Sequence, residues 1–293
     1  MKLRNGLIAT LIVLMLGGYI NAQESNVLDG IYIKEHTPGR KPIPYGSNGP
    51  YGTPLVREAN VMWMKRVWRR IDLREKINHP LYFPIDPIAD RRSLFDVLKD
   101  AILMEGTITA YDPGPLGDDD EFKVKMTLDD VKSLLFSADT VYTEDPETEE
   151  MIPELITTEL KTDMIKQFEV KEEWFFDRER SVLDVRIIGL CPMKEVIDEV
   201  TGEFRGYQPL FWVYFPEARY VFANREVFNP KNDAERRTME DIFWKRQFGS
   251  YVVKESNVYD RFINEYLVGL DALLEADRVK DDIFVLEHDL WHF

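Results

Sequence analysis

The sequence contains few of the residues that form disulfides, bind metals or act as nucleophiles. Cys191 is the one cysteine among 293 residues, and there are four histidines. A chain with a single cysteine cannot form an internal disulfide, so an apolar core has to hold its fold. Because Cys191 lies within an apolar run, we expect its thiol to be buried and inert.

Long apolar runs are missing beyond the N-terminus. After the first 22 residues no stretch reaches the ~18 uninterrupted apolar residues that a transmembrane helix needs. The N-terminus itself has Lys2 and Arg4 ahead of the apolar run 7–16, which is the layout of a secretory signal peptide. We therefore predict that residues 1–22 are removed on export. We expect the mature chain to be soluble once exported, and its formal charge changes from −16 to −18.

Familiar catalytic motifs are absent. The sequence has no GxxxxGK[ST], GxSxG or HExxH pattern, and the glycines of 46–52 do not fit GxGxxG. We expect no enzymatic activity, no cofactor and no bound metal. The alternative is an exported metal-binding protein or hydrolase that uses His288 and His292, spaced four apart, with the acidic loop 117–121. Two features favour a protein without enzymatic activity or bound metal. The two histidines lie at the end of the chain, where ends fray, and the acidic loop lacks the ligand spacing of an EF-hand.

Composition indicates a folded acidic protein. Apolar residues make up 44% of the chain and aromatic residues 12%, and 53 acidic residues outnumber 37 basic ones. This composition is typical of a globular protein with a substantial core. The negative charge argues against nucleic acid as a partner, because phosphates would be repelled.

Proline and glycine concentrate in one segment near the N-terminus. Residues 38–54 contain nine of them in seventeen positions, which excludes a helix or a central strand. We predict an extended arm over residues 23–56. It is either a flexible leader or an arm that lies on a neighbouring subunit, with Tyr45 and Tyr51 as apolar anchors.

The remaining residues, 57–293, read as an α+β region of mixed helices and antiparallel hairpins, because βαβ alternation is missing. An acidic, turn-rich break suggests a sub-boundary near 143–153. The expected elements are a helix capped by Ser93, strands at 107–111 and 122–126, a helix with a Thr127–Asp130 capping box, hairpins turning at 178–180 and 201–202, and helices after Pro216, at 234–248 and at 258–278.

A basic stretch bearing two tryptophans stands out against the acidic background. Seven basic and three acidic residues lie between positions 57 and 76. Apolar residues recur at helical spacing between Val61 and Ile71, which predicts a helix with Trp68 in the core and the arginines facing outward. Such a segment can bind nucleic acid, an anionic membrane, a protein partner or the chain's own carboxylates. We favour contact with a protein partner or with the chain's own carboxylates. The candidate partner-binding residues are Trp63, Arg66, Arg69, Arg70, Tyr45 and Tyr51.

Three segments carry a family resemblance. They are "REANVMWMKRVWRRIDLREKINHPLYFP" at 57–84, the "LFDVLKDAI" that follows, and "YQPLFWVYFPEAR" at 207–219. They resemble the GldN family, also called PorN, of the Bacteroidetes type IX secretion and gliding-motility machinery. The resemblance implies a structural subunit of a periplasmic ring, held to the outer membrane by a lipoprotein partner, the GldK/PorK-like K component. It also implies contact with the periplasmic region of the GldM/PorM-like inner-membrane motor component M, and it offers no catalytic residues.

Overall fold

The computed structural model describes residues 56–290 except 57, 89, 90, 116, 145–150, 199–201, 230, 231 and 233–236, and for 137–157 it describes the backbone alone. The predicted signal peptide and nearly all of the predicted arm lie outside the described residues, as do Tyr45, Tyr51 and His292. The chain is α+β, as predicted.

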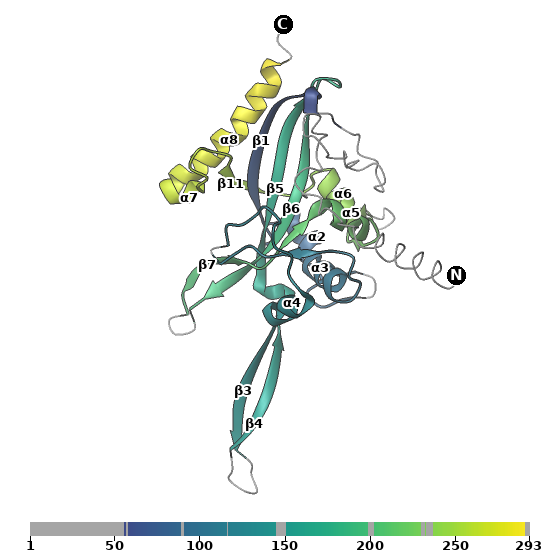
Figure 1. Ribbon diagram of the computed structural model, residues 1–293, viewed down its shortest axis with the longest axis vertical. Coiled ribbons are helices and arrows are strands. Elements are labelled where there is room, and N and C mark those ends of the chain that lie inside the picture. Colours follow the sequence, from purple (N-terminus) through teal and green to yellow (C-terminus); the bar gives the residue numbers. More distant parts are fainter. Residues whose placement is uncertain are drawn as a thin grey trace, which may run out of the picture.

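A seven-stranded antiparallel sheet forms the centre of the molecule (Figure 1). Its order is β11-β1-β5-β6-β8-β2, and β7 also pairs with β6. The strands are β1 (Val61–Asp72), β2 (Ala110–Tyr111), β5 (Ile165–Asp177), β6 (Val182–Ile197), β7 (Phe204–Pro209), β8 (Trp212–Tyr214) and β11 (Tyr251–Glu255). A separate pair is formed by β9 (Glu226–Val227) and β10 (Arg237–Thr238).

Both hairpins predicted around β6 are confirmed. β5 and β6 pair antiparallel and are joined by the turn at 178–181. β6 then pairs with β7, and Gly202, which belongs to the predicted second turn, has a φ of +68°. A positive φ is easily adopted by glycine because it has no Cβ. Local turn chemistry therefore placed the central meander correctly.

The helix predicted for residues 61–71 is wrong, because this stretch is the strand β1. It pairs with β5 on one side and with β11 on the other. Both faces of a central strand are covered, so neighbouring residues such as Val67 and Trp68 are both buried although they lie on opposite faces. Because apolar residues lie on both faces of this strand, their spacing in the sequence resembles that of one face of a helix.

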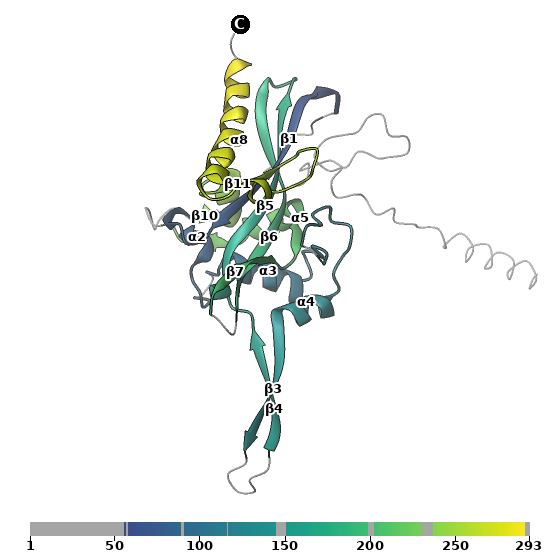
Figure 2. The same cartoon turned by 90° about the vertical axis from the view of Figure 1, so that its left-hand side faces the viewer.

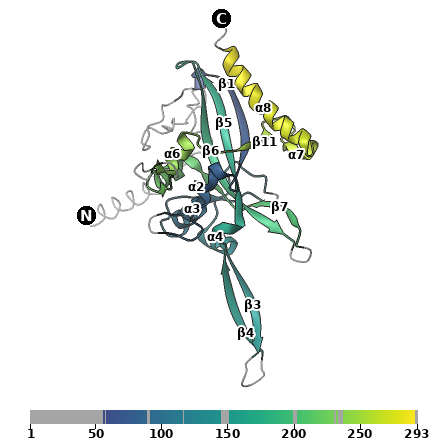
Figure 3. The same cartoon turned by 180° about the vertical axis from the view of Figure 1, so that it is seen from behind.

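The helices cover the sheet in two groups (Figures 1 and 3). α8 lies beside β11, whereas α5 packs against β6 and β8, and α6 packs against α5. The described helices are α2 (His79–Tyr82), α3 (Leu94–Leu103), α4 (Leu128–Leu135), α5 (Phe215–Ala223), α6 (Met239–Trp244), α7 (Ile263–Tyr266) and α8 (Leu270–Asp289). Short 3₁₀ turns lie at η2 (Glu58–Asn60), η3 (Lys76–Asn78) and η4 (Thr162–Met164).

Alternate residues of the central strands divide the core between the two faces. Phe168 and Val170 of β5 belong to the cluster under α3, α5 and α6, whereas Phe175 belongs to a second cluster with Trp68 and Phe122. Phe122 reaches this second face from the loop after β2. The strand predicted at 122–126 is therefore wrong: this stretch makes a single bridge, between Tyr111 and Lys125, and packs over the sheet. The strand predicted at 107–111 shortens to Ala110–Tyr111.

The C-terminal helices differ from their predicted limits. The helix expected at 234–248 is present as α6, which is only six residues long. The single helix expected at 258–278 is wrong, because two helices occupy this region. α7 ends at Tyr266, and Gly269 has a φ of +65° just before α8 begins. The strand β11, not anticipated from the sequence, lies between α6 and α7 in the chain and extends the sheet.

A long hairpin projects away from the body of the molecule (Figures 1 and 2). It is formed by β3 (Phe136–Glu144) and β4 (Met151–Glu159), which make nine register pairs from Phe136–Glu159 to Glu144–Met151. The sub-boundary predicted near 143–153 falls at the far end of this hairpin. The division into 1–22, 23–56 and 57–293 stays a prediction.

The helix caps predicted at Ser93 and Thr127 are confirmed. The contribution of the Ser93 cap to stability can be measured. The Ser93 hydroxyl accepts a hydrogen bond from the Asp96 backbone at 3.1 Å and lies 2.9 Å from the Thr162 hydroxyl. Because Ser93 is fully buried, we expect Ser93→Ala to lower the free energy of unfolding by about 1–2 kcal/mol. Urea denaturation measures this free energy, and Ser133→Ala, at an exposed position of α4, should change it by less than about 0.5 kcal/mol. Equal effects at both sites would contradict the assignment.

Candidate interaction site

The basic residues of β1 face carboxylates on neighbouring strands. Arg66 Nε lies 3.0 Å from Glu173, and Arg70 Nε lies 3.0 Å from Glu169. Each pair is directly opposite in the register of β1 and β5. Lys65 contacts Glu255 of β11 at 2.6 Å. Of the uses considered for this stretch, the geometry favours pairing with the chain's own carboxylates.

Arg69 is buried inside the sheet, contrary to the outward orientation expected from a helix. Its guanidinium donates to the Ser250 hydroxyl at 2.9 Å and to the Ser250 carbonyl at 3.0 Å. Burial lowers the pKa of Arg69, while Glu172 acts in the opposite direction. Trp63 is half-buried against the apolar cluster under α8. A partner-binding role for Trp63, Arg66, Arg69 and Arg70 stays a prediction.

Trp68 is the centre of a buried cationic and aromatic cluster, which confirms its predicted place in the core. Its ring is 5% exposed and lies 5.5 Å from the Lys171 ammonium and 4.7 Å from that of Lys254. These lysines are its register partners on β5 and β11. The indole N–H donates to Asp120, which also pairs with Lys171 at 3.1 Å. The cluster fastens the loop after β2 onto the sheet.

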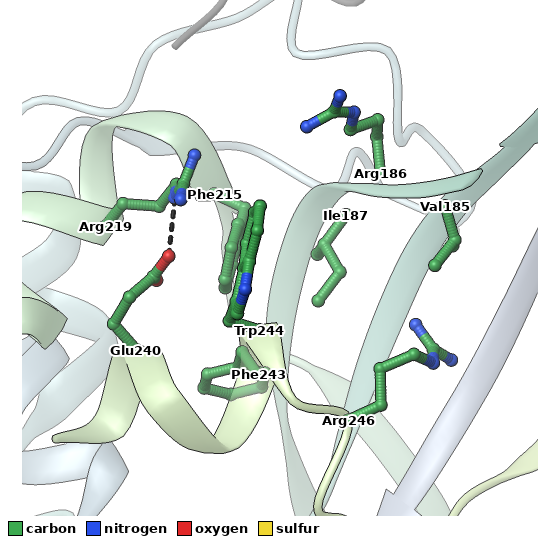
Figure 4. Close-up of a pocket in the computed structure, with 9 residues that line it drawn as sticks. All are labelled: Val185, Arg186, Ile187, Phe215, Arg219, Glu240, Phe243, Trp244 and Arg246. Atoms are coloured by element: carbon green, nitrogen blue, oxygen red, sulfur yellow. Dashed lines mark hydrogen bonds and ion pairs between the residues drawn. The ribbon is translucent and has the colours of Figure 1, made fainter. Parts of the chain in front are cut away.

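A second buried charge pair lies between α5 and α6 (Figure 4). Arg219 Nε lies 2.6 Å from the Glu240 carboxylate, and the guanidinium stacks 5.3 Å from the Trp244 ring centre. Burial raises the pKa of Glu240, and Arg219 opposes this rise. Figure 4 shows both side chains beside a cavity of about 50 Å³ that Phe243 also lines.

This cavity is small and is lined mainly by aromatic, aliphatic and arginine side chains. Among the residues that the structure describes, no histidine, cysteine or serine lines it, and its Arg246 pairs with Glu172 at 2.9 Å. Ligand pockets usually enclose about 300–1,000 Å³, whereas a space of this size holds a few water molecules. The sequence analysis missed this ion pair because Arg219 and Glu240 are 21 positions apart. A charged residue at a helix position that should be buried was the one signal that could have indicated it.

Two further expectations from the sequence have different outcomes. Cys191 is fully buried, as predicted, and burial raises the pKa of its thiol well above the usual value; the inertness of the thiol stays a prediction. His288 is exposed near the end of α8, and His292 lies outside the described residues. Within the part of the chain that the structure describes, no three His, Cys, Asp or Glu side chains gather as a metal site would require.

Comparison with known proteins adds the family. The family described as "Gliding motility associated protein GldN" matches residues 56–292 of this chain. A search of curated proteins found no match to this chain. In the described part of the chain, every helix is too short or too polar to cross a membrane.

Proposed function

Because the chain belongs to the GldN family, a component of the gliding-motility and type IX secretion machinery, we propose that it is a structural subunit of a periplasmic ring. In this proposal it assembles with an outer-membrane lipoprotein of the K type and with further copies of itself. It also meets the periplasmic region of the inner-membrane component M. The family is structural and is not known for enzymatic activity.

The projecting β3–β4 hairpin is the observation that carries this proposal. Its nine residue pairs extend beyond the sheet, and among the described helices it contacts α4 at its base. An isolated two-stranded ribbon is at best marginally stable in water. Within the part of the chain that the structure describes, the outer edges of both strands are unpaired, so they are ready to pair with another chain. A ribbon of this length is therefore best explained as an arm that another subunit covers.

The composition of the hairpin indicates the surface that would receive it. Both strands contain apolar residue types, such as Val141 in β3 and Leu155 in β4. They also contain four acidic residues, Asp139, Glu144, Glu154 and Glu159, and no basic one. A complementary surface would combine an apolar floor or an open strand edge with a cationic rim.

Shortening the hairpin tests the proposal. Replacing residues 138–157 by a short Asn-Gly turn removes the projecting part and leaves the core clusters intact. We expect the variant to fold with an unchanged thermal transition but to form no rings when co-expressed with its lipoprotein partner. Electron microscopy and light scattering measure assembly, and circular dichroism measures folding.

A second hairpin supplies the matched control. The described end of the β6–β7 hairpin is formed by Ile197 and Phe204, which are both more than half exposed, so replacing residues 198–203 by a short turn should leave ring formation unchanged. Normal rings from the variant lacking 138–157 would overturn the assembly role of the β3–β4 hairpin. Loss of rings in both variants would show that assembly is merely sensitive to any loop change.

A further inference from the structure

A groove runs between the start of α8 and the edge strand β11, and the polar residues Arg70, Tyr251 and Asn264 line it together with apolar ones. It encloses about 230 Å³. Small residues of α8, Ala272 and Ala276, form one wall, and Val252 with Phe262 and Ile263 lines the other. Leu273 stands at its rim with 56% of its surface exposed. The volume is below the usual range for small-molecule pockets and suits the insertion of one large apolar side chain.

α8 carries a second apolar stripe on the side away from its buried face, and Figures 2 and 3 show the course of this helix beside the sheet. Its buried face consists of Ala276, Val279 and Ile283. At 3.6 residues per turn, the opposite side carries another set at i, i+3 and i+4 spacing. These exposed residues are Leu270, Leu273, Leu274, Asp277, Asp281, Phe284 and Val285. An amphipathic helix that only covered its own sheet would be polar on this side.

The charge of α8 identifies the kind of partner. The helix contains seven acidic and two basic residues, a formal charge of −5. Asp277 and Asp281 lie in the middle of the exposed stripe, between the apolar ends at Leu270 and Phe284. These ends are about 21 Å apart at 1.5 Å per residue. The order along the stripe is therefore apolar, anionic, apolar.

We propose that the groove and the exposed stripe of α8 bind a cationic amphipathic helix of a partner protein. One large apolar side chain of that helix enters the groove beside Leu273. Lysine or arginine side chains one to two turns further on pair with Asp277 and Asp281, and a second apolar group covers Phe284. Burial of apolar surface supplies affinity, and the charge pairs set the register.

Two other occupants fit the charges less well. A second copy of this chain brings a formal charge of −16 and meets the acidic helix with net repulsion. An anionic membrane surface repels carboxylates in the centre of the stripe. Both remain possible outcomes of the experiment below, and each would overturn the proposal.

Peptide binding to the full mature chain tests the proposal. The probe is a synthetic helix of about 18 residues, long enough to span the stripe, with leucine at helical spacing and lysine elsewhere. Its fluorescence anisotropy is measured at about 150 mM salt, where distant charges are screened within about 8 Å. We expect Asp277→Lys with Asp281→Lys to weaken binding about tenfold or more, because two attractions become repulsions. Leu273→Ala should weaken it about fivefold.

The matched control is Asp282→Lys with Glu287→Lys, which makes the same charge change on α8 away from the stripe. It should change affinity by less than about threefold. Equal weakening by the two pairs, or equal binding of a peptide with glutamate in place of every lysine, would refute the site. So would dimerisation of the chain that Leu273→Ala abolishes, or retention on anionic vesicles. The variant lacking 138–157 should bind the peptide normally, so failure here is distinguishable from failure of the ring proposal.

Discussion

Replacing Trp68 with alanine is expected to lower the free energy of unfolding by about 3–5 kcal/mol, the range for removing a large aromatic from a core. The indole is 5% exposed and packs in the cluster with Phe122 and Phe175. Its loss also leaves Asp120 without the indole N–H and removes the ring from beside Lys171. The loop after β2 should then detach more readily from the sheet.

Urea denaturation of the mature chain measures this effect. Met62→Ala on the same strand is the control, because Met62 is 63% exposed and should change the free energy of unfolding by less than about 0.5 kcal/mol. Hydrogen exchange of residues 117–126 should accelerate in the Trp68 variant relative to α3. A loss below about 1 kcal/mol would show that the cluster contributes little to stability.

Removing Arg219 alone is expected to be similarly costly. In Arg219→Met the Glu240 carboxylate is left buried at 1% exposure without its partner, which typically costs about 3–5 kcal/mol. The double variant Arg219→Met with Glu240→Leu removes both charges and should recover most of that loss. Denaturant unfolding of the wild type, the two single variants and the double variant gives the coupling energy directly.

The pH dependence of the Arg219→Met variant has a definite sign. Burial raises the pKa of Glu240, and removing the arginine that opposes this rise should raise it further. The folded state then holds the proton more tightly than the unfolded state, so stability decreases as pH rises from the unfolded value through the folded pKa. The destabilisation relative to the double variant should therefore be small near pH 4 and reach its full size at higher pH. A pH-independent difference would contradict this account.

Local signals in the sequence were sufficient for several elements. Ser93 and Thr127 cap the helices they were expected to cap, because an N-cap involves side chains and backbone within three residues. The turn after β5 was also readable from adjacent residues. Trp68 was correctly placed in the core although its helix was wrong, since a large aromatic residue is buried in either element.

The charged pairs could not be found in the same way. Arg66 and Glu173 are 107 positions apart, and Arg69 and Ser250 are 181 apart. The basic stretch was visible, but nothing near it in sequence says which carboxylates will lie opposite once β1 enters the sheet between β5 and β11. The groove beside α8 was hidden for the same reason, because its second wall comes from β11, a strand that had no recognisable pattern.

Composition and short-range chemistry alone established an acidic α+β protein with no disulfide, its caps and turns, and the segments by which it resembles its family. Tertiary pairing decided that the basic tryptophan segment is a central strand, that its cations neutralise internal carboxylates, and which apolar surfaces stay uncovered. The physical reason is range: caps and turns are satisfied within a few residues, whereas strand register and ion pairing depend on groups that only folding brings within 3 Å of each other.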